Sequence, residues 1–289
     1  MLNKSGILKY KYLHIMTTRE KEVVEYYLKG YSAKTISVNI QCNVKTVWAI
    51  LKRNNIKARS LSEAAMKYTC NEEFFSNIDT EHKAYWLGAL FADGNISKKA
   101  SKSGQIFLTS ADKDWVENFM KDIGSSNFPR KEVHKHFKTC VWKAQITSAK
   151  MFNDLNHIGC VPAKSKIIEL PIIKNDLLNH FIRGYFDGDG TVGVYKNIKT
   201  LDWKILKSGI CSGSKKFVEQ LLEILPTKNK SIKYIGVYVA QFSLNDSLAL
   251  YNYLYKDATI FLKRKKKVFD DYIQNYKPRK RFRDYNRLP

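Results

Sequence analysis

Residues 86–94 read WLGALFADG, and residues 182–190 read IRGYFDGDG. Each stretch contains two small residues four positions apart: Gly88 and Ala92, then Gly184 and Gly188. Small residues at this spacing lie on one face of a helix, where they let two helix backbones approach closely. We therefore predict two helices that pack against each other through these small residues.

Both stretches end in an aspartate followed by glycine, and the two aspartates, Asp93 and Asp189, are 189 − 93 = 96 residues apart. Packing at the small residues would bring both carboxylates to one end of the helix pair. Like charges held together raise each other's pKa unless a cation lies between them. Carboxylate oxygens suit Mg²⁺, and a carboxylate pair sharing Mg²⁺ suits phosphodiester hydrolysis. A capping role alone is common for Asp-Gly, but here the acid recurs at both matched positions.

Two further matches indicate that the motifs belong to a duplicated fold. Residues 144–146 (AQI) match 240–242 (AQF) at the same offset, and residues 110–117 resemble 212–219 at a slightly larger one. After each motif the sequence pattern predicts two extended segments, a helix, two more extended segments and a closing helix. Helices and hairpin strands within one repeat are typical of an α+β fold.

Residues 1–58 predict a small all-α domain. Thr17 and Glu20 have the spacing of a capping box, which begins a helix, and two short helices follow at residues 32–39 and 44–54. This arrangement resembles a helix-turn-helix, whose last helix enters the DNA major groove; a plain three-helix packing module is the alternative. The DNA-contacting residues predicted on the last helix are Lys45, Thr46 and Trp48 at bases, and Lys52 and Arg53 at phosphates.

The predicted domain order is a helix-turn-helix domain at 1–58, a linker at 59–71, the first repeat at 72–168, the second repeat at 169–276 and a basic tail at 277–289. The basic run Lys263–Lys267 lies just before this tail. We expect it either to contact phosphates or simply to be solvated.

The chain has 50 Lys and Arg residues against 27 Asp and Glu residues, a formal net charge of +23. Such an excess favours a polyanionic partner, because each neutralised phosphate releases counterions; a lysine-rich surface without function is the alternative. The sequence has neither a membrane-length apolar stretch nor a signal-peptide pattern. Its 5 cysteines include no C-x-x-C pair, so we expect reduced, mostly buried thiols in an intracellular protein.

Residues 72–275, with their paired nonapeptides, resemble the single-chain, two-repeat LAGLIDADG homing endonucleases. The resemblance implies a DNA-binding saddle of two pseudo-symmetric αββαββα halves with the motif helices at their interface. It implies that the last acid of each motif, Asp93 or Asp189, binds a divalent metal, Mg²⁺, and that Ala92 and Gly188 contribute to the metal site. Mn²⁺ or Ca²⁺ would replace Mg²⁺ for binding. The family's first acid is kept as Asp187 but is Phe91 in the first copy, and because that position is not a metal ligand we expect little damage.

The predicted strand at 141–147 places alternate side chains on the face of the sheet that would form the DNA-binding groove. Lys143 and Gln145 alternate with core-like residues, so they face away from the core. Lys143 is a candidate catalytic residue that would polarise water or the scissile phosphate; an ordinary phosphate contact is the alternative. Its repeat partner is Val239, so the two half-sites are unequal. Gln145 and its partner Gln241 are candidate groove residues that would order water or contact DNA.

These observations favour a monomeric, site-specific double-strand DNA endonuclease with a long target site and no membrane association. A non-cleaving DNA-binding regulator or an intron RNA maturase on the same fold is the alternative, although both acids are present. An intein-embedded enzyme is disfavoured, because the sequence does not begin with Cys or Ser and does not end in His-Asn.

Overall fold

The computed structural model describes residues 16–28, 31–59, 68–98, 104–133, 140–197 and 200–275. The chain divides into two compact units, residues 1–68 and 69–289, which we describe separately. The predicted basic tail at 277–289 and most of the predicted linker at 59–71 lie outside the described residues. No helix among the described residues is long and apolar enough to cross a membrane.

The described residues of the first unit form three short helices, as the sequence predicted: α1 (Thr18–Leu28), α2 (Ala33–Asn39) and α3 (Val44–Arg53). The predicted capping box is present: the Thr17 amide donates to Glu20 Oε2 at 2.9 Å, and the Glu20 amide donates to Thr17 Oγ1 at 3.3 Å. The side chains of Ser32 and Asn43 cap α2 and α3. The core of this unit includes Val23 and Tyr27 of α1, whereas Leu28, the last residue of that helix, is 70% exposed.

The second unit repeats one order of elements twice, which confirms the predicted αββαββα repeats. The first repeat contains α5 (Glu81–Asp93), β1 (Gly94–Lys98), β2 (Gly104–Ser110), α6 (Lys113–Asp122), β3 (Arg130–Val133), β4 (Cys140–Thr147) and α7 (Ala149–Ile158). The second contains α8 (Leu178–Asp189), β5 (Thr191–Asn197), β6 (Thr200–Ser212), α9 (Lys215–Ile224), β7 (Lys233–Tyr234), β8 (Tyr238–Phe242) and α10 (Leu244–Tyr255). Two short 3₁₀ helices, Lys164–Lys166 and Asn175–Leu177, lie in the connection between the repeats.

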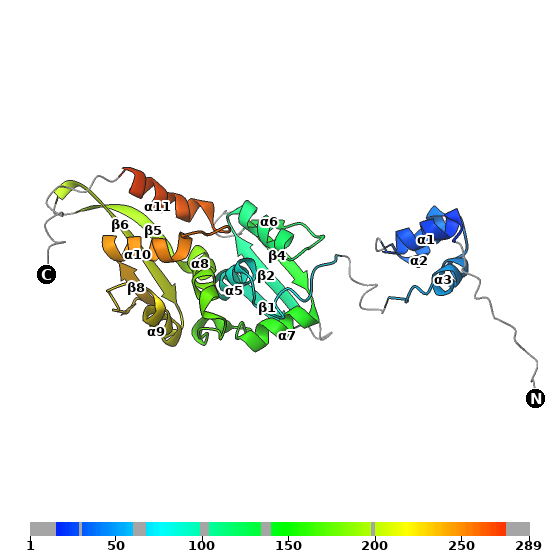
Figure 1. The fold of residues 1–289 in the computed structure, drawn as a ribbon, viewed down its shortest axis with the longest axis horizontal. Helices are drawn as coiled ribbons and strands as arrows, with labels where there is room; N and C mark the ends of the chain where they lie inside the picture. Colours follow the sequence, from blue (N-terminus) through cyan, green and yellow to red (C-terminus); the bar gives the residue numbers. More distant parts are fainter. Residues whose placement is uncertain are drawn as a thin grey trace, which may run out of the picture. The chain divides into compact units, whose positions relative to one another are not determined.

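Each repeat forms a four-stranded antiparallel sheet, with strand orders β1-β2-β4-β3 and β5-β6-β8-β7. In β4, Ala144 and Ile146 are buried while the alternate residues Lys143 and Gln145 are partly exposed, as period-two alternation requires. The helices cover one face of each sheet, and Figure 1 shows α5 and α8 side by side between the two halves. Among the described residues, no helix covers the other face of either sheet.

The motif helices α5 and α8 touch through their backbones. A Cβ added to Gly88 would overlap the carbonyl oxygen of Phe181, and one added to Gly184 would overlap that of Tyr85. Nearer the helix ends, a Cβ on Gly188 would lie 2.5 Å from that of Ala92. Only residues without a larger side chain permit this approach, which is the physical reason for the repeated small residues.

A further helix, α11 (Lys263–Asn275), follows the second repeat. We had assigned the run Lys263–Lys267 to solvated or phosphate-contacting basic sequence, and that prediction was wrong for Lys265, which is 6% exposed. Phe269 and Tyr272 are buried on the same helix, so an apolar stripe at helical spacing lies within a strongly basic segment. The charge of the segment obscured that stripe in the sequence.

The cysteines are all free thiols, as expected, but they are not mostly buried. Cys160 is buried, Cys140 is exposed, and the other three are partly exposed. Cys140 is the first residue of β4 and pairs with Val133, which is also exposed at the end of β3.

Replacing Gly184 by alanine should destabilise the second unit by about 3 kcal/mol, because the new methyl group would overlap the Tyr85 carbonyl and force the helices apart. Urea unfolding followed by circular dichroism measures this loss. Gly124→Ala is the control: its φ is +62° and its nearest neighbour would be 3.9 Å away, so strain alone should cost about 1 kcal/mol. Equal losses in both variants would contradict close packing at Gly184.

Candidate active site

Asp93 and Asp189 are the last residues of α5 and α8. A Cβ added to Gly188 would lie 3.0 Å from Asp93 Oδ2, so the Asp93 carboxylate reaches across to the end of the other helix. Burial of this carboxylate, followed by the negative charge of Asp189, raises the pKa of Asp93 to about 6. The structure thus brings the two sequence-predicted acids together.

Asp189 lies in a similar setting. Burial raises its pKa, and the charges of Lys164 and Lys265 and a hydrogen bond with Tyr185 act in the opposite direction. Within the part of the chain that the structure describes, no donor hydrogen-bonds the Asp93 carboxylate. Two crowded carboxylates, one without a hydrogen-bond donor, form an oxygen-rich and negatively charged pair. Such a donor set fits a hard divalent cation such as Mg²⁺.

Among the described residues, no group of three or more His, Cys, Asp or Glu side chains is placed to hold a metal. A cation at the helix ends would therefore rely on this carboxylate pair, with backbone carbonyls or water completing its coordination.

Two buried lysines cap the ends of the motif helices. Lys164 Nζ donates to the carbonyl of Ala92 at 3.3 Å and to that of Gly94. Lys265 Nζ donates to the matching carbonyls in the second repeat, Gly188 at 2.7 Å and Gly190 at 2.5 Å. These lysines satisfy carbonyls that a helix leaves unpaired at its C-terminus, and their charge opposes the negative end of the helix dipole.

Lys164 and Lys265 are 7% and 6% exposed, respectively. Burial lowers the pKa of Lys265 to about 8, although the charge of Asp187 and both motif acids act in the opposite direction. The capping role of neither lysine is predicted from the sequence. The available signal was their shared position: each follows the closing helix of its repeat, and they lie 265 − 164 = 101 residues apart.

The capping lysines bind the same backbone carbonyls, those of Ala92 and Gly188, that the sequence predicts as metal ligands. Both carbonyls already accept a hydrogen bond from a lysine ammonium. A carbonyl oxygen has two lone pairs, so a cation would have to share these atoms with the lysines. Metal binding by Ala92 and Gly188 stays a prediction.

Lys143 is predicted to polarise water or the scissile phosphate, but its side-chain contacts are not with the two acids. Its Nζ is 3.4 Å from Glu132 Oε1 and 4.7 Å from the centre of the Phe107 ring. The cations that lower the pKa of Asp93 are instead Lys265, Lys164 and Arg264. The contacts of Lys143 do not support a direct role at the acids, and its catalytic role stays a prediction.

The predicted groove residues Gln145 and Gln241 occupy matched positions. Gln145 lies opposite Phe107, and Gln241 lies opposite Gly209. Gln145 is partly exposed and Gln241 is exposed, so both lie on the face of their sheet away from the helices.

Asp187, the first acid of the second motif, is 1% exposed and points into the core. Its carboxylate accepts hydrogen bonds from the hydroxyls of Tyr85 and Tyr255 and from the Leu262 amide, each at 2.7 Å. At the matched position Phe91 packs edge-on against Phe181, with ring centroids 5.1 Å apart. Both side chains point into the core, and the expectation that this difference does little damage stays a prediction.

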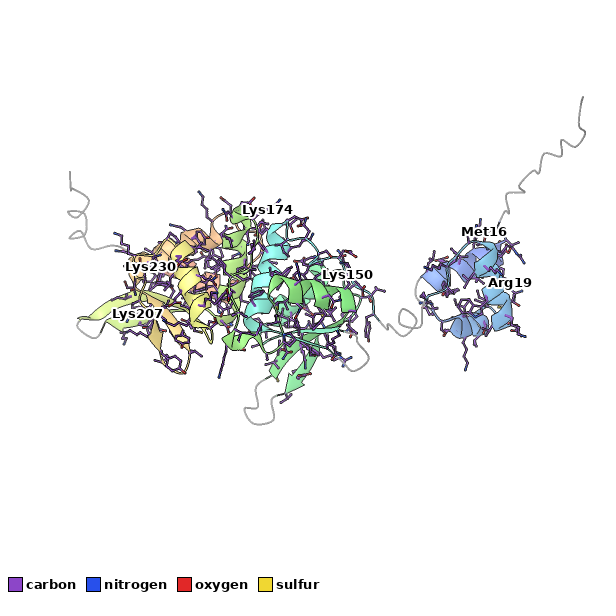
Figure 2. All side chains as sticks on the ribbon, turned by 90° about the horizontal axis from the view of Figure 1, so that it is seen from below. Met16, Arg19, Lys150, Lys174, Lys207 and Lys230 are labelled. Carbon is purple, nitrogen blue, oxygen red and sulfur yellow. The ribbon has the colours of Figure 1, made fainter. Side chains whose placement is uncertain are left out.

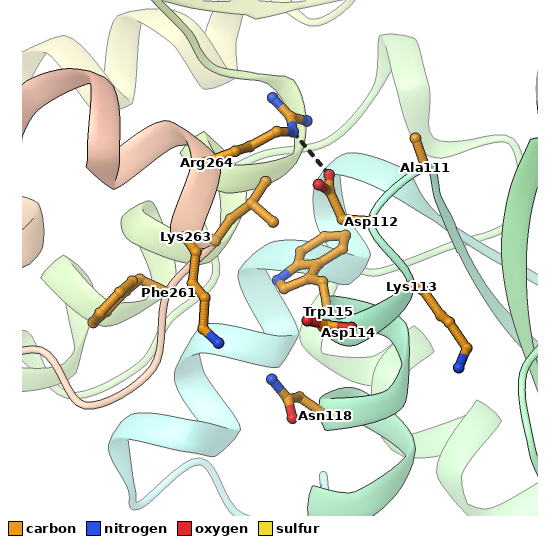
Figure 3. Close-up of a pocket in the computed structure, with 10 residues that line it drawn as sticks. Ala111, Asp112, Lys113, Asp114, Trp115, Asn118, Phe261, Lys263 and Arg264 are labelled. Carbon is orange, nitrogen blue, oxygen red and sulfur yellow. Dashed lines mark hydrogen bonds and ion pairs between the residues drawn. The ribbon is translucent and has the colours of Figure 1, made fainter.

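The segment that leads into α11 also contacts the first repeat. Arg264 Nε donates to Asp112 Oδ2 at 2.8 Å across a cavity of about 370 Å³ (Figure 3). Trp115, which lines this cavity, donates to the Tyr85 hydroxyl at 2.7 Å and so joins the Asp187 hydrogen bonds. These contacts hold the start of α11, and with it Lys265, against the motif helices.

In the first unit, the sequence-predicted DNA residues Lys45, Thr46, Trp48 and Lys52 are exposed on α3. Trp48 also packs edge-on against Tyr27 at 5.8 Å. Arg53 already has an ionic partner within the protein, because its guanidinium pairs with the buried Glu20 at 2.9 Å. Arg53 therefore stabilises the three-helix core, and its contact with DNA stays a prediction.

Searches of protein-family models and of curated proteins found no match to this chain. Solved structures are similar to it. The homing endonuclease I-WcaI bound to its DNA recognition sequence is 15% identical over 75% of this chain and 96% of its own, with a TM-score of 0.49. I-SmaMI bound to an uncleaved DNA target with calcium ions is 12% identical over 68% and 90%, with a TM-score of 0.46. The LAGLIDADG meganuclease I-AabMI bound to uncleaved DNA is 14% identical over 66% and 88%, with a TM-score of 0.43. Identities this low carry over no residue's role.

Asp93→Asn should stabilise the metal-free protein at neutral pH by about 1 kcal/mol, because the amide removes the repulsion from Asp189. The gain stays small because the carboxylate packs against protein on one side only, and solvent on the other side screens part of the repulsion. The folded pKa of about 6 exceeds the ordinary aspartate pKa of 3.8, so the folded state retains a proton that the unfolded state loses. Wild-type stability in EDTA should therefore fall as the pH rises from about 4 through 6. The variant should lack this fall, and thermal melts across pH measure it.

The control for this pH effect is Asp271→Asn, which removes an exposed acid paired with Lys267 on α11. We expect its stability to change by less than about 0.5 kcal/mol at any of these pH values. Added Ca²⁺ should raise the melting temperature of the wild type and of Asp271→Asn, but not that of Asp93→Asn. A wild type whose stability rises through this pH range would contradict the repulsion between the acids.

Proposed function

We propose that this chain is a site-specific DNA endonuclease of the LAGLIDADG homing type, which hydrolyses one phosphodiester in each strand with Mg²⁺. The observation that supports the proposal is the crowded carboxylate pair at the joined ends of α5 and α8. Burial and mutual repulsion raise the pKa of Asp93 to about 6, and a divalent cation relieves such repulsion. Bound at this pair, Mg²⁺ would supply charge neutralisation at the phosphate and a more acidic bound water.

The other residues of the site would orient the acids. Lys164 and Lys265 hold the last carbonyls of both helices, so the carboxylates start from fixed backbone positions. Their buried positive charges also lower the free energy of a nearby anionic phosphate. Fixed geometry and nearby positive charge are what phosphodiester hydrolysis requires of a protein beyond its metal.

Double-stranded DNA would lie along the sheet faces that the helices leave uncovered. Lys143, Gln145 and Gln241 are on these faces. The exposed Lys207 of β6 (Figure 2) is two residues from Gly209, so its side chain points to the same face of the sheet as that of Gln241, which pairs with Gly209. Strand side chains at such positions read base edges in the major groove. The net charge of +23 supplies the attraction for phosphates. Since both acids belong to one chain, a monomer suffices, and the protein would act inside the cell.

The first unit would add a second DNA contact through α3. Its exposed face carries Lys45, Thr46 and Lys52, and the first turns of the last helix of a helix-turn-helix meet bases while nearby cations meet phosphates. A contact of this kind would raise the affinity for the long target without taking part in hydrolysis.

A non-cleaving regulator or an intron RNA maturase on the same fold is the alternative function. Neither requires paired acids, so the charge repulsion at Asp93 and Asp189 would be retained there without a use. The endonuclease is therefore the better supported proposal.

Cleavage of a plasmid library of random or candidate intron-insertion sites tests the function. The wild type should linearise selected plasmids in Mg²⁺ and leave them intact in EDTA. Asp93→Asn and Asp189→Asn should each lower the rate of double-strand cleavage about a hundredfold or more, equivalent to about 3 kcal/mol, while still binding the site. The surface variant Asp271→Asn should cut like the wild type. If all variants bind and none cuts, with Mg²⁺ or Mn²⁺, the protein is a binding module or a maturase.

Lys52→Ala should weaken binding to the recovered target and lower the slope of log affinity against log salt by about 1, because one phosphate contact is lost. Fluorescence anisotropy at several salt concentrations measures the slope. The control Lys21→Ala removes the same charge from the exposed surface of α1 and should leave the slope unchanged. An equal change in both variants would argue against a DNA-facing role for α3.

A further inference from the structure

The hairpin of β3 and β4 carries two opposite charges on the sheet face that points away from the helices. Lys143 Nζ lies 3.4 Å from Glu132 Oε1, and the two side chains are 30% and 50% exposed. The same ammonium lies 4.7 Å from the centre of the Phe107 ring on β2. An exposed ion pair contributes little to stability, so both groups remain available to another polar partner. We name Glu132 and Lys143 the charged pair.

The matching hairpin of the second repeat, β7 and β8, is apolar at the same positions. Val239 pairs with the first residue of β7, and Lys143 pairs with the first residue of β3. Ile235 is two residues beyond the start of β7, as Glu132 is two residues beyond the start of β3. Ile235 and Val237, in the turn between the strands, are 72% and 38% exposed, and Val239 is partly exposed. We name Ile235, Val237 and Val239 the apolar patch.

A glutamine stands next to each of these sets. Gln145 follows Lys143 by two residues on β4, and Gln241 follows Val239 by two residues on β8, so each glutamine shares a sheet face with that neighbour. The two hairpins therefore present the same amide beside different chemistry. Exposed apolar side chains gathered on a chain of net charge +23 indicate a surface that a partner covers.

The major-groove edges of base pairs distinguish these two surfaces. A G·C pair presents the guanine N7 and O6 acceptors beside the cytosine N4 donor. The ammonium of Lys143 complements the acceptors, and the carboxylate of Glu132 complements the donor. Thymine presents a 5-methyl group, which apolar side chains contact, whereas a G·C edge against the apolar patch would leave its polar atoms without partners. A glutamine amide pairs with adenine N6 and N7.

We propose that the two half-sites of the DNA target differ at one matched position, which is a G·C pair where the charged pair lies and a thymine where the apolar patch lies. Beside this position Gln145 and Gln241 each read an adenine, so the neighbouring base is the same in both halves. The inference rests on the DNA-binding part of the proposed function, and it concerns binding rather than hydrolysis.

Selection of bound duplexes from a random pool tests the base assignment without any cleavage. The protein is incubated with the pool in Ca²⁺, and the retained duplexes are sequenced. The recovered sites should carry adenine at matched positions of both halves, with guanine next to one adenine and thymine next to the other. Sites with the same base next to both adenines would overturn the inference.

Small chemical changes in the recovered duplex test the individual contacts. Uracil in place of the thymine removes only the 5-methyl group and should weaken binding about fourfold, the factor for one buried methyl group. In the other half, 7-deazaguanine removes the N7 acceptor and should weaken binding about fivefold or more. Uracil in place of thymine in the flanking DNA is the control and should leave the affinity unchanged. Fluorescence anisotropy measures all three affinities.

An exchange of side chains identifies which hairpin reads which base. Ile235→Glu with Val239→Lys copies the charged pair into the second hairpin and should change the base it prefers from thymine to guanine, by about tenfold in relative affinity. A folding defect cannot produce this gain. The control, Ile167→Lys with Ile172→Glu, makes the same kinds of substitution at two exposed isoleucines between the repeats and should leave the base preference unchanged.

The outcomes separate the two proposals. Uracil duplexes that bind as tightly as thymine duplexes, or an exchange that leaves thymine preferred, would overturn the base assignment, while linearised plasmids would still support the endonuclease. Binding with the expected bases but no strand scission in Mg²⁺ or Mn²⁺ would overturn the endonuclease and support the base assignment. If uracil has no effect and Ile235→Glu converts a wild-type dimer to a monomer, the apolar patch contacts a second copy of the chain and the base assignment is wrong.

Discussion

The backbone contact between α5 and α8 is the constraint on which the rest of the second unit depends. Gly88 and Gly184 leave no side chain between the helices, so each backbone lies against a carbonyl of the other helix. Each glycine stands at the same spacing before its aspartate, and the helices therefore end together. Because β1 begins directly after α5 and β5 begins one residue after α8, the same contact also determines where both sheets lie relative to the acids.

This arrangement concentrates negative charge, and the structure offsets it with cations that the fold itself buries. Two helix C-termini and two carboxylates meet at one place, and each contributes negative potential. Lys164 and Lys265 neutralise part of it by donating to the terminal carbonyls rather than to the carboxylates. The carboxylates thus keep their oxygens available, while the carbonyls are satisfied. A direct ion pair with the acids would have stabilised the protein more simply but occupied the site.

Much of this architecture follows from the sequence, and the exceptions have physical causes. Small-residue spacing predicted the helix pair, and strand alternation predicted the outward direction of Lys143 and Gln145. The capping lysines escaped prediction because a buried lysine looks like a surface lysine until its tertiary partners are known. For the same reason, the charge of 263–267 hid a helix, and the pairing of Arg53 with Glu20 was not visible. The periodicity of apolar residues in the sequence predicts which face of a helix or strand a residue occupies. Its hydrogen-bond partner depends on residues far away in the sequence, which the periodicity does not identify.

The contrast between Asp187 and Phe91 shows what joining the repeats in one chain allows. In a dimer of identical subunits, any residue at this position would occur twice, and a carboxylate that needs two tyrosines and a loop amide would need all of them on both sides. Two repeats joined in one chain need not carry the same residue at matched positions, so each repeat can differ from the other, as Asp187 and Phe91 do. A DNA reader built in this way is not confined to palindromes, because its two halves need not recognise the same sequence.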